Sequence, residues 1–256
     1  MDNINPVSIP PPIPAAYSPT LAPGESPEDR IPINGFITAV EAILRQPRRV
    51  IYQLGQGSST SLTAALLTIA VLCAGLYGLV VGTFSMGEQL WAAPVKVVLG
   101  LLVCGFICLP SLYIFSCLSG SEARLGTVLG MLAGLLALMT ILLIGFAPVA
   151  WVFSQSTNSP TMMGGLHLVF WFVATIFGMK FLFTGMRHLR LRSSGGLQVW
   201  TIIFILVMLQ MTTALRPLVE KGTFLPKEKK FFLAHWIDSI NKEEKKNDAV
   251  VLPPTR

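Results

Sequence analysis

The sequence predicts an all-α, polytopic integral membrane protein: a bundle of about five transmembrane helices preceded by an amphipathic surface helix. Composition is the first observation, since 52% of the 256 residues are hydrophobic and only 12% are charged. A soluble protein usually carries about 25% charged residues. The second observation is the distribution of the charges, which gather at the two ends and in short loops. They leave several apolar runs of about 20 residues, which is the length that crosses a bilayer core of roughly 30 Å.

The centre of the predicted bundle is a helical hairpin between Ala92 and Phe153. Two long apolar segments are joined there by the short turn Ser119-Gly120-Ser121-Glu122. The second segment runs from Ala123 to beyond Val149, which exceeds a simple crossing, so we expect it to be tilted or broken near Gly145–Pro148.

Two segments are predicted before the first span. Residues 1–33 are rich in proline and poor in large apolar residues, which predicts a disordered tail of polyproline-II character. The tail is either passive or a ligand for an aromatic groove in a partner. Residues 34–57 carry apolar residues at helical spacing (Phe36, Val40, Ile43 and Leu44), and Pro47 should end or kink that helix. The helix lies either on the membrane surface, with its arginines towards lipid phosphates, or on the protein's own cytoplasmic face.

The transmembrane domain is predicted over residues 58–217. Its five spans are expected at about 62–83, 92–117, 123 to beyond 149, 163–185 and 197–215. A polar C-terminal tail, 218–256, follows and contains the short aromatic segment 231–237, whose rings suit a membrane interface.

Small residues and prolines predict where the helices pack and bend. The pair Gly78 and Gly82 matches GxxxG, and a longer ridge recurs every fourth residue at Gly126, Gly130 and Gly134. Such spacing lets helix backbones approach closely in lipid. Pro110 and Pro148 are expected to kink their spans, and Ser111 or Tyr113 could satisfy the carbonyl that Pro110 leaves free.

Basic residues beside the spans predict the orientation. With the N-terminus in the cytoplasm, the inner side holds seven arginines: Arg45, Arg48, Arg49, Arg124, Arg187, Arg190 and Arg192. The opposite loops, 84–90 and 154–161, hold no lysine or arginine. The positive-inside rule then places the N-terminus inside and the C-terminus outside, and we expect a bacterial inner membrane. The net charge of +6 is explained by this asymmetry and requires no nucleic-acid partner.

Four stretches are similar to a known group of proteins. They are I-L-R-Q-P-R-R-V (Ile43–Val50), L-P-S-L-Y-I-F-S-C-L-S-G (Leu109–Gly120), Gly145–Pro148 and Q-M-T-T-A-L-R-P (Gln210–Pro217). Together with the five-span pattern they resemble the Yip family and related bacterial multi-pass membrane proteins of unassigned activity. Eukaryotic members of that family bind small GTPases. The family's acidic-Leu-Tyr-Gly-Pro motif is missing here, with only Leu76-Tyr77-Gly78 as a partial match, so GTPase binding is not expected.

The sequence contains no recognisable set of residues that would support enzymatic chemistry. It contains no nucleotide-binding loop, HExxH or GxSxG motif, and no Asp or Glu lies within any predicted span. Four cysteines (Cys73, Cys104, Cys108 and Cys117) have neither CxxC nor zinc spacing and are interpreted as small buried hydrophobes. We therefore expect no enzyme activity, no cofactor and no metal. A transporter coupled to protons through carboxylates is also disfavoured.

The one candidate site consists of three residues that are predicted to lie at the same depth. Lys96, His167 and Arg216 all fall near the outer ends of their spans, where together they could bind a lipid phosphate or another anion. The alternative is that each side chain snorkels separately to the interface, as expected for Lys180 at the inner end. The sequence thus favours a non-enzymatic scaffold, assembly factor or subunit of a membrane complex. Its expected partners are membrane lipids and a membrane protein or second copy. The alternative function is a lipid or small-solute transporter with this outer-leaflet site.

Overall fold

The computed structural model describes residues 22–57, 59–84, 89–157 and 160–214. This part of the chain is all-helical, with a short 3-10 helix followed by seven α-helices. The elements are η1 (Pro27–Arg30), α1 (Phe36–Arg45), α2 (Pro47–Gly55), α3 (Thr60–Thr83), α4 (Gln89–Leu118), α5 (Leu125–Ser156), α6 (Pro160–His188) and α7 (Gly195–Ala214). The predicted all-α class is confirmed. Residues 1–21 of the predicted tail, and the C-terminal tail with its aromatic segment, lie outside the described residues.

Four of the helices are long and apolar enough to cross a membrane. They are Thr60–Thr83, Leu90–Leu118, Leu125–Ser156 and Met162–His188, and they correspond to the first four predicted spans. The apolar part of α7, Gly195–Met211, is shorter than these. The structure therefore supports the membrane-protein class, while the fifth crossing stays a prediction.

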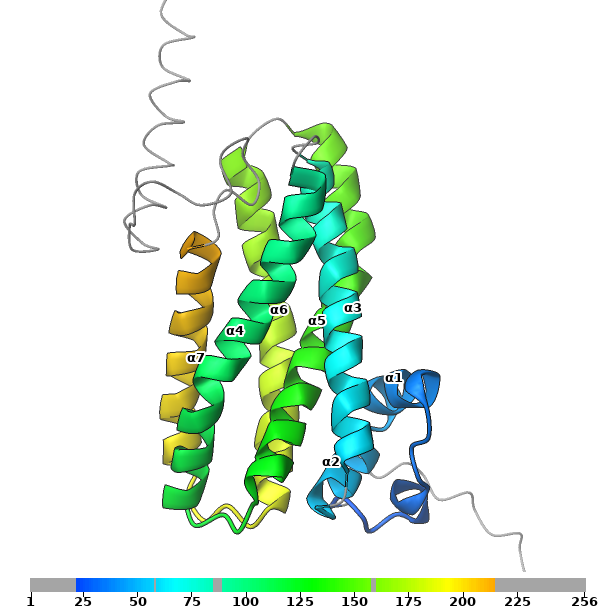
Figure 1. The fold of residues 1–256 in the computed structure, drawn as a ribbon, viewed down its shortest axis with the longest axis vertical. Helices are drawn as coiled ribbons and strands as arrows, with labels where there is room; N and C mark the ends of the chain where they lie inside the picture. The colour runs from blue at the N-terminus through cyan, green and yellow to red at the C-terminus, as the bar shows by residue number, and fades with distance from the viewer. Residues whose placement is uncertain (1–21, 58, 85–88, 158–159, 215–256) are drawn as a thin grey trace, which may run out of the picture.

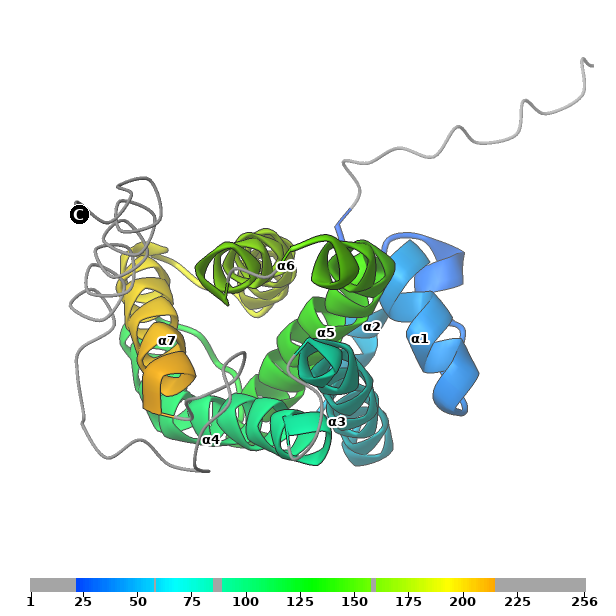
Figure 2. The same ribbon diagram turned by 90° about the horizontal axis from the view of Figure 1, so that it is seen from above.

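Helix α5 is the centre of the bundle. It packs between α3 and α6, while α4 contacts α3 and carries α7 on its other side (Figures 1 and 2). Every residue from 131 to 137 is buried, whereas a lipid-exposed helix buries only one side. The interior around these residues is filled by leucine, methionine and alanine side chains of the neighbouring helices.

The two proline-containing spans are continuous helices. Helix α5 runs for 32 residues through Pro148 and crosses the bundle obliquely, so the predicted break near Gly145–Pro148 is wrong, while the tilt in the bilayer stays a prediction (Figure 1). Helix α4 likewise continues through Pro110. The Ser111 hydroxyl donates to the carbonyl of Cys108 (2.9 Å), not to that of Phe106, which Pro110 leaves free. The predicted role of Ser111 is therefore wrong.

The segment predicted as one surface helix forms two. Helix α1 ends at Arg45 and α2 begins at Pro47, with Gln46 between them in a non-helical conformation (φ −133°, ψ 56°). This break agrees with the prediction at Pro47 and has the expected cause, because proline favours the first turn of a helix and cannot continue the preceding one. Helix α2 packs against the bundle, burying Val50, Ile51 and Leu54.

Helix α1 is apolar on two sides. Ala39, Ala42 and Ile43 are buried, whereas Phe36 and Leu44 are 43% and 47% exposed. The predicted single apolar face, which grouped Phe36 and Leu44 with Ile43, is therefore divided between the protein and its surroundings.

Residues 22–33, which the sequence assigned to the disordered tail, are folded against α2. Arg49 donates from Nε to the carbonyl of Ile31 (2.9 Å) and from Nη2 to that of Pro32 (3.1 Å). The amide of Ile33 donates to Oε1 of Gln53 (3.0 Å), and Asp29 is buried and accepts from the amide of Gly24 (3.0 Å). The tail prediction is wrong here because side chains of α2 and η1 satisfy this segment's backbone groups. Arg49 therefore binds the protein's own carbonyls, which at this residue agrees with the second predicted alternative, a helix on the protein's own face.

One end of the bundle brings two loops together. The amide of Arg192 donates to the carbonyl of Ser119 (3.0 Å), and the Ser121 hydroxyl donates to the carbonyl of Leu189 (3.1 Å). The α4–α5 and α6–α7 loops thus form one hydrogen-bonded edge, close to the start of α3 (Figure 1). We call this edge, residues 119–124 and 189–194, the basic edge, because it carries Arg124, Arg190 and Arg192.

Candidate functional site

A polar contact inside the bundle joins α3 to α6. Tyr77 Oη lies 2.7 Å from Nδ1 of His167, and the two rings meet edge-on with centroids 5.6 Å apart. Tyr77 is 3% exposed. The other ring nitrogen of His167, Nε2, is buried and has no hydrogen-bond partner among the described residues. Because a buried polar atom without a partner is costly, Nε2 of His167 is a candidate contact for a ligand.

Lys96 lies at a similar depth on α4. Helices α3 and α4 are so close at Gly78 that a methyl group there would lie 2.5 Å from Cα of Pro94. Lys96 is two residues beyond Pro94, and a helix rises 1.5 Å per residue, so it is within about one turn of the level of Tyr77. Its side chain has no exposed surface. Lys96 is therefore covered by protein, unlike a lysine that snorkels freely towards the interface.

The predicted three-residue site is thus described in part. Lys96 is buried and so is Nε2 of His167, while Arg216 lies outside the described residues. Tyr77, which the sequence analysis noted only within a partial motif, is the direct partner of His167. Sequence spacing does not reveal it, because the two residues are 90 positions apart.

The predicted packing glycines differ in their surroundings. A Cβ atom at Gly130 would lie 2.7 Å from Cδ2 of Leu54, and one at Gly134 would lie 2.5 Å from Cε1 of Phe181. Gly126 has nothing within 4 Å. Gly78 packs on the α4 backbone as described, and Gly82 is buried. The ridge on α5 is therefore a contact surface at two of its three positions.

The cysteines are all free thiols. Cys104 and Cys108 are buried on one side of α4, and Cys73 is partly buried. Cys117 is exposed, so the interpretation of all four as buried hydrophobes is wrong at this position. Among the described residues, no cluster of three or more His, Cys, Asp or Glu side chains is placed to hold a metal ion.

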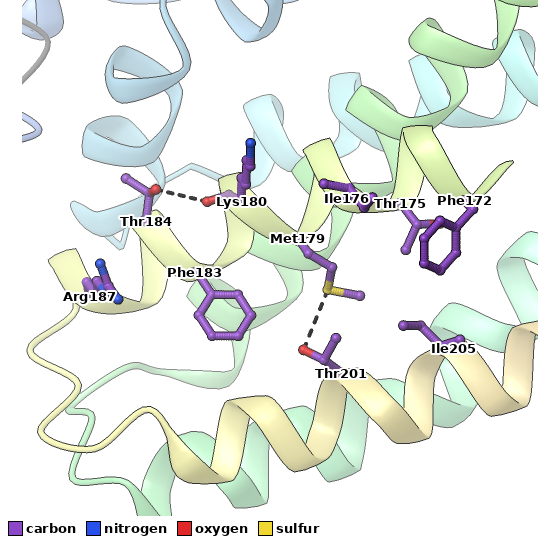
Figure 3. Close-up of a pocket in the computed structure, with 10 residues that line it drawn as sticks. All are labelled: Phe172, Thr175, Ile176, Met179, Lys180, Phe183, Thr184, Arg187, Thr201 and Ile205. Carbon is purple, nitrogen blue, oxygen red and sulfur yellow. Dashed lines mark hydrogen bonds between the residues drawn. The ribbon is translucent and has the colours of Figure 1, made fainter. Parts of the chain in front are cut away.

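A groove opens between α6 and α7. It has a volume of about 560 Å³, and its α6 wall presents Phe172, Ile176, Met179 and Phe183 (Figure 3). Thr201 and Ile205 form the α7 wall. Thr201 Oγ1 and Met179 Sδ approach to 3.8 Å across it. The groove exists because α7 packs on α4 instead of α6: the indole Nε1 of Trp200 donates to the Cys108 carbonyl (3.0 Å) and anchors α7 there (Figure 2).

Two basic residues of α6 are among those that line this groove. Arg187 lies at the end nearest the basic edge, whereas the Lys180 side chain points away from α7, with Nζ 5.4 Å from the ring centroid of Phe177 (Figure 3). Lys180 was predicted to snorkel to the interface, and Arg187 entered only the prediction of orientation. The spacing from Phe172 to Arg187 does show one helix face, but it does not show that α7 leaves that face open.

Comparison of the chain with known protein families, curated proteins and solved structures gives no match.

Proposed function

We propose that this chain is a non-enzymatic multi-pass membrane protein that acts as a scaffold, assembly factor or subunit of a membrane complex. The proposal concerns what the bundle offers to other molecules: external helix faces, a docked N-terminal segment and a lateral groove. The resemblance to Yip-like proteins, which are themselves multi-pass membrane proteins, is consistent with this proposal.

The closed interior around α5 is the observation that carries the proposal. Residues 131–137 are buried and apolar, and the helices packed on them contribute mainly aliphatic and aromatic side chains. No Asp or Glu occurs in α3 to α7. A proton- or ion-coupled pathway usually needs ionisable groups along the interior of the bundle, and here the middle of α5 supplies none.

Purification from native membranes tests the proposal. We expect a membrane protein to be recovered with the tagged chain in stoichiometric amount and to be missing from a matched purification of an unrelated multi-pass protein. The same purified chain alone in liposomes should neither move solutes nor turn over lipid. Solute flux or lipid turnover by the chain alone would contradict the proposal.

A transporter is the second candidate, and the burial of Lys96 and of Nε2 of His167 favours it. A buried cationic side chain and a histidine nitrogen without a partner, at one level in a membrane bundle, are typical of sites for anionic or polar ligands. In this proposal Arg216 joins them to bind a lipid phosphate or small anion. Liposome uptake of a panel of organic anions, with Lys96→Met and His167→Leu as variants, tests it. Uptake that both variants leave unchanged would exclude this site.

The orientation and the fifth crossing are also proposed. The basic edge and the arginines of α1 and α2 lie at one end of the bundle, which the positive-inside rule assigns to the cytoplasm. If α7 crosses, the C-terminus is outside. A C-terminal alkaline phosphatase fusion, which is active only outside, should then be active, and a C-terminal green fluorescent protein fusion should be dark. The reverse pattern would mean four crossings.

A further inference from the structure

The geometry points to a binding site for one anionic phospholipid in the groove between α6 and α7. Its acyl chain would lie along the apolar wall, and its phosphate would contact Arg187. The leaflet concerned is the one on the side of the basic edge. The lipid site is argued from the groove alone and does not rest on the scaffold proposal. Lipid occupancy and partner recovery are also measured on separate samples, so either can fail without the other.

Charge and polarity are distributed along the groove as along a phospholipid. Phe172, Ile176 and Ile205 form its apolar part, and Arg187 closes the end nearest the basic edge. The groove lining among the described residues includes no carboxylate that would compete for the arginine. An arginine guanidinium binds phosphate through two parallel, charge-assisted hydrogen bonds, which are stronger than those between neutral groups.

The length of the groove matches one leaflet. From Phe172 to Arg187 there are 15 residues of helix, which at 1.5 Å per residue span about 22 Å. A bilayer with its headgroups is about 40–45 Å thick, so one leaflet measures about 20–22 Å. A lipid with its phosphate at Arg187 would therefore end its acyl chain near Phe172.

The groove is too small to enclose a transmembrane helix, and its charge favours a lipid. A helix with side chains is about 10 Å wide, so a 22 Å length of it occupies on the order of 1,700 Å³. The groove holds about 560 Å³, within the range of about 300–1,000 Å³ typical of small-molecule sites. A partner helix would also have to neutralise Arg187 with an acidic residue of its own, whereas an anionic lipid brings the complementary charge.

Native mass spectrometry of the full chain in detergent tests the site. We expect phosphatidylglycerol to be retained roughly tenfold more than phosphatidylcholine, and Arg187→Gln to lower phosphatidylglycerol retention roughly tenfold. Arg187→Lys should retain part of the binding. Arg124→Gln is the matched control, because it removes one charge at the same end of the bundle but outside the groove. Ile205→Trp fills the groove and should lower retention of both lipids. Soluble glycerophosphate should not compete, since it has no acyl chain.

The site is overturned if Arg124→Gln lowers retention as much as Arg187→Gln, which would mean general charge attraction. Retention unchanged in Ile205→Trp would also overturn it. A measurement on the unaltered protein guards against variants that fail to fold. Phosphatidylglycerol carrying a diazirine on its acyl chain should label peptides of 172–187 and 201–205 preferentially. Labelling spread evenly over all lipid-facing helices, or crosslinking of a protein at the groove in native membranes in place of lipid, would contradict the proposal.

Discussion

Tyr77 on α3 and His167 on α6 are joined by a 2.7 Å polar contact that reaches across the bundle beside α5. We predict that Tyr77→Phe lowers the free energy of unfolding by about 1 kcal/mol, because it removes one buried hydrogen bond and leaves the ring in place. A double-variant cycle with His167→Leu, followed by thermal unfolding in detergent, measures the coupling. Additive effects of the two substitutions would show that the contact does not stabilise the fold.

At Gly78, helix α3 packs directly against the backbone of α4. We predict that Gly78→Ala destabilises the protein by about 1–3 kcal/mol, because the new methyl group would lie 2.5 Å from the Pro94 backbone, which cannot rotate away. Gly75→Ala is the control on the same helix, since its Cβ would meet only Val98 at an ordinary 3.8 Å. Equal unfolding temperatures for the two variants would contradict the prediction.

Gly126 and Gly130 lie one turn apart on the α5 ridge but have different surroundings. We predict that Gly130→Leu prevents stable folding or lowers the unfolding temperature strongly, because its side chain would enter space filled by Leu54 and Thr63. Gly126→Leu should be tolerated, since nothing lies within 4 Å of that Cβ position. Gel filtration and thermal unfolding in detergent compare the two. A stable Gly130→Leu variant would show that α2 and α3 can move away from α5.

Arg49 holds residues 31–33 against α2. We predict that Arg49→Ala raises the hydrogen-exchange rate of the Ile33 amide roughly tenfold, because the loss of charge-assisted bonds to two carbonyls weakens the local structure by about 1.5 kcal/mol.

Arg45→Ala is the control for Arg49. Arg45 forms an exposed i, i+4 ion pair with Glu41 at 3.0 Å, and such pairs contribute only a few tenths of a kcal/mol, about 0.3–0.5. The Ile33 amide should therefore exchange at its normal rate in this variant. Similar rates in both variants would mean that Arg49 does not hold the segment.

Composition and apolar run length predict the helical class and the positions of the first four long helices, because a segment that crosses a bilayer must satisfy its own backbone and be apolar along its length. The break at Pro47 is also predictable, since proline acts through local geometry alone.

Partner choice between helices was decided only by the tertiary structure. In lipid, nearly every side of a span is apolar, so hydrophobic periodicity does not show which side meets another helix. That is why Gly126 resembled Gly130 in sequence, and why the Tyr77–His167 contact and the α6–α7 groove were missed. Arg49 and Gln53 show the same limit in the N-terminal segment, where side chains of α2 order residues whose own composition predicted disorder. The sequence by itself determined a helical membrane protein; long-range packing decided which polar groups are enclosed and which face of α6 stays open.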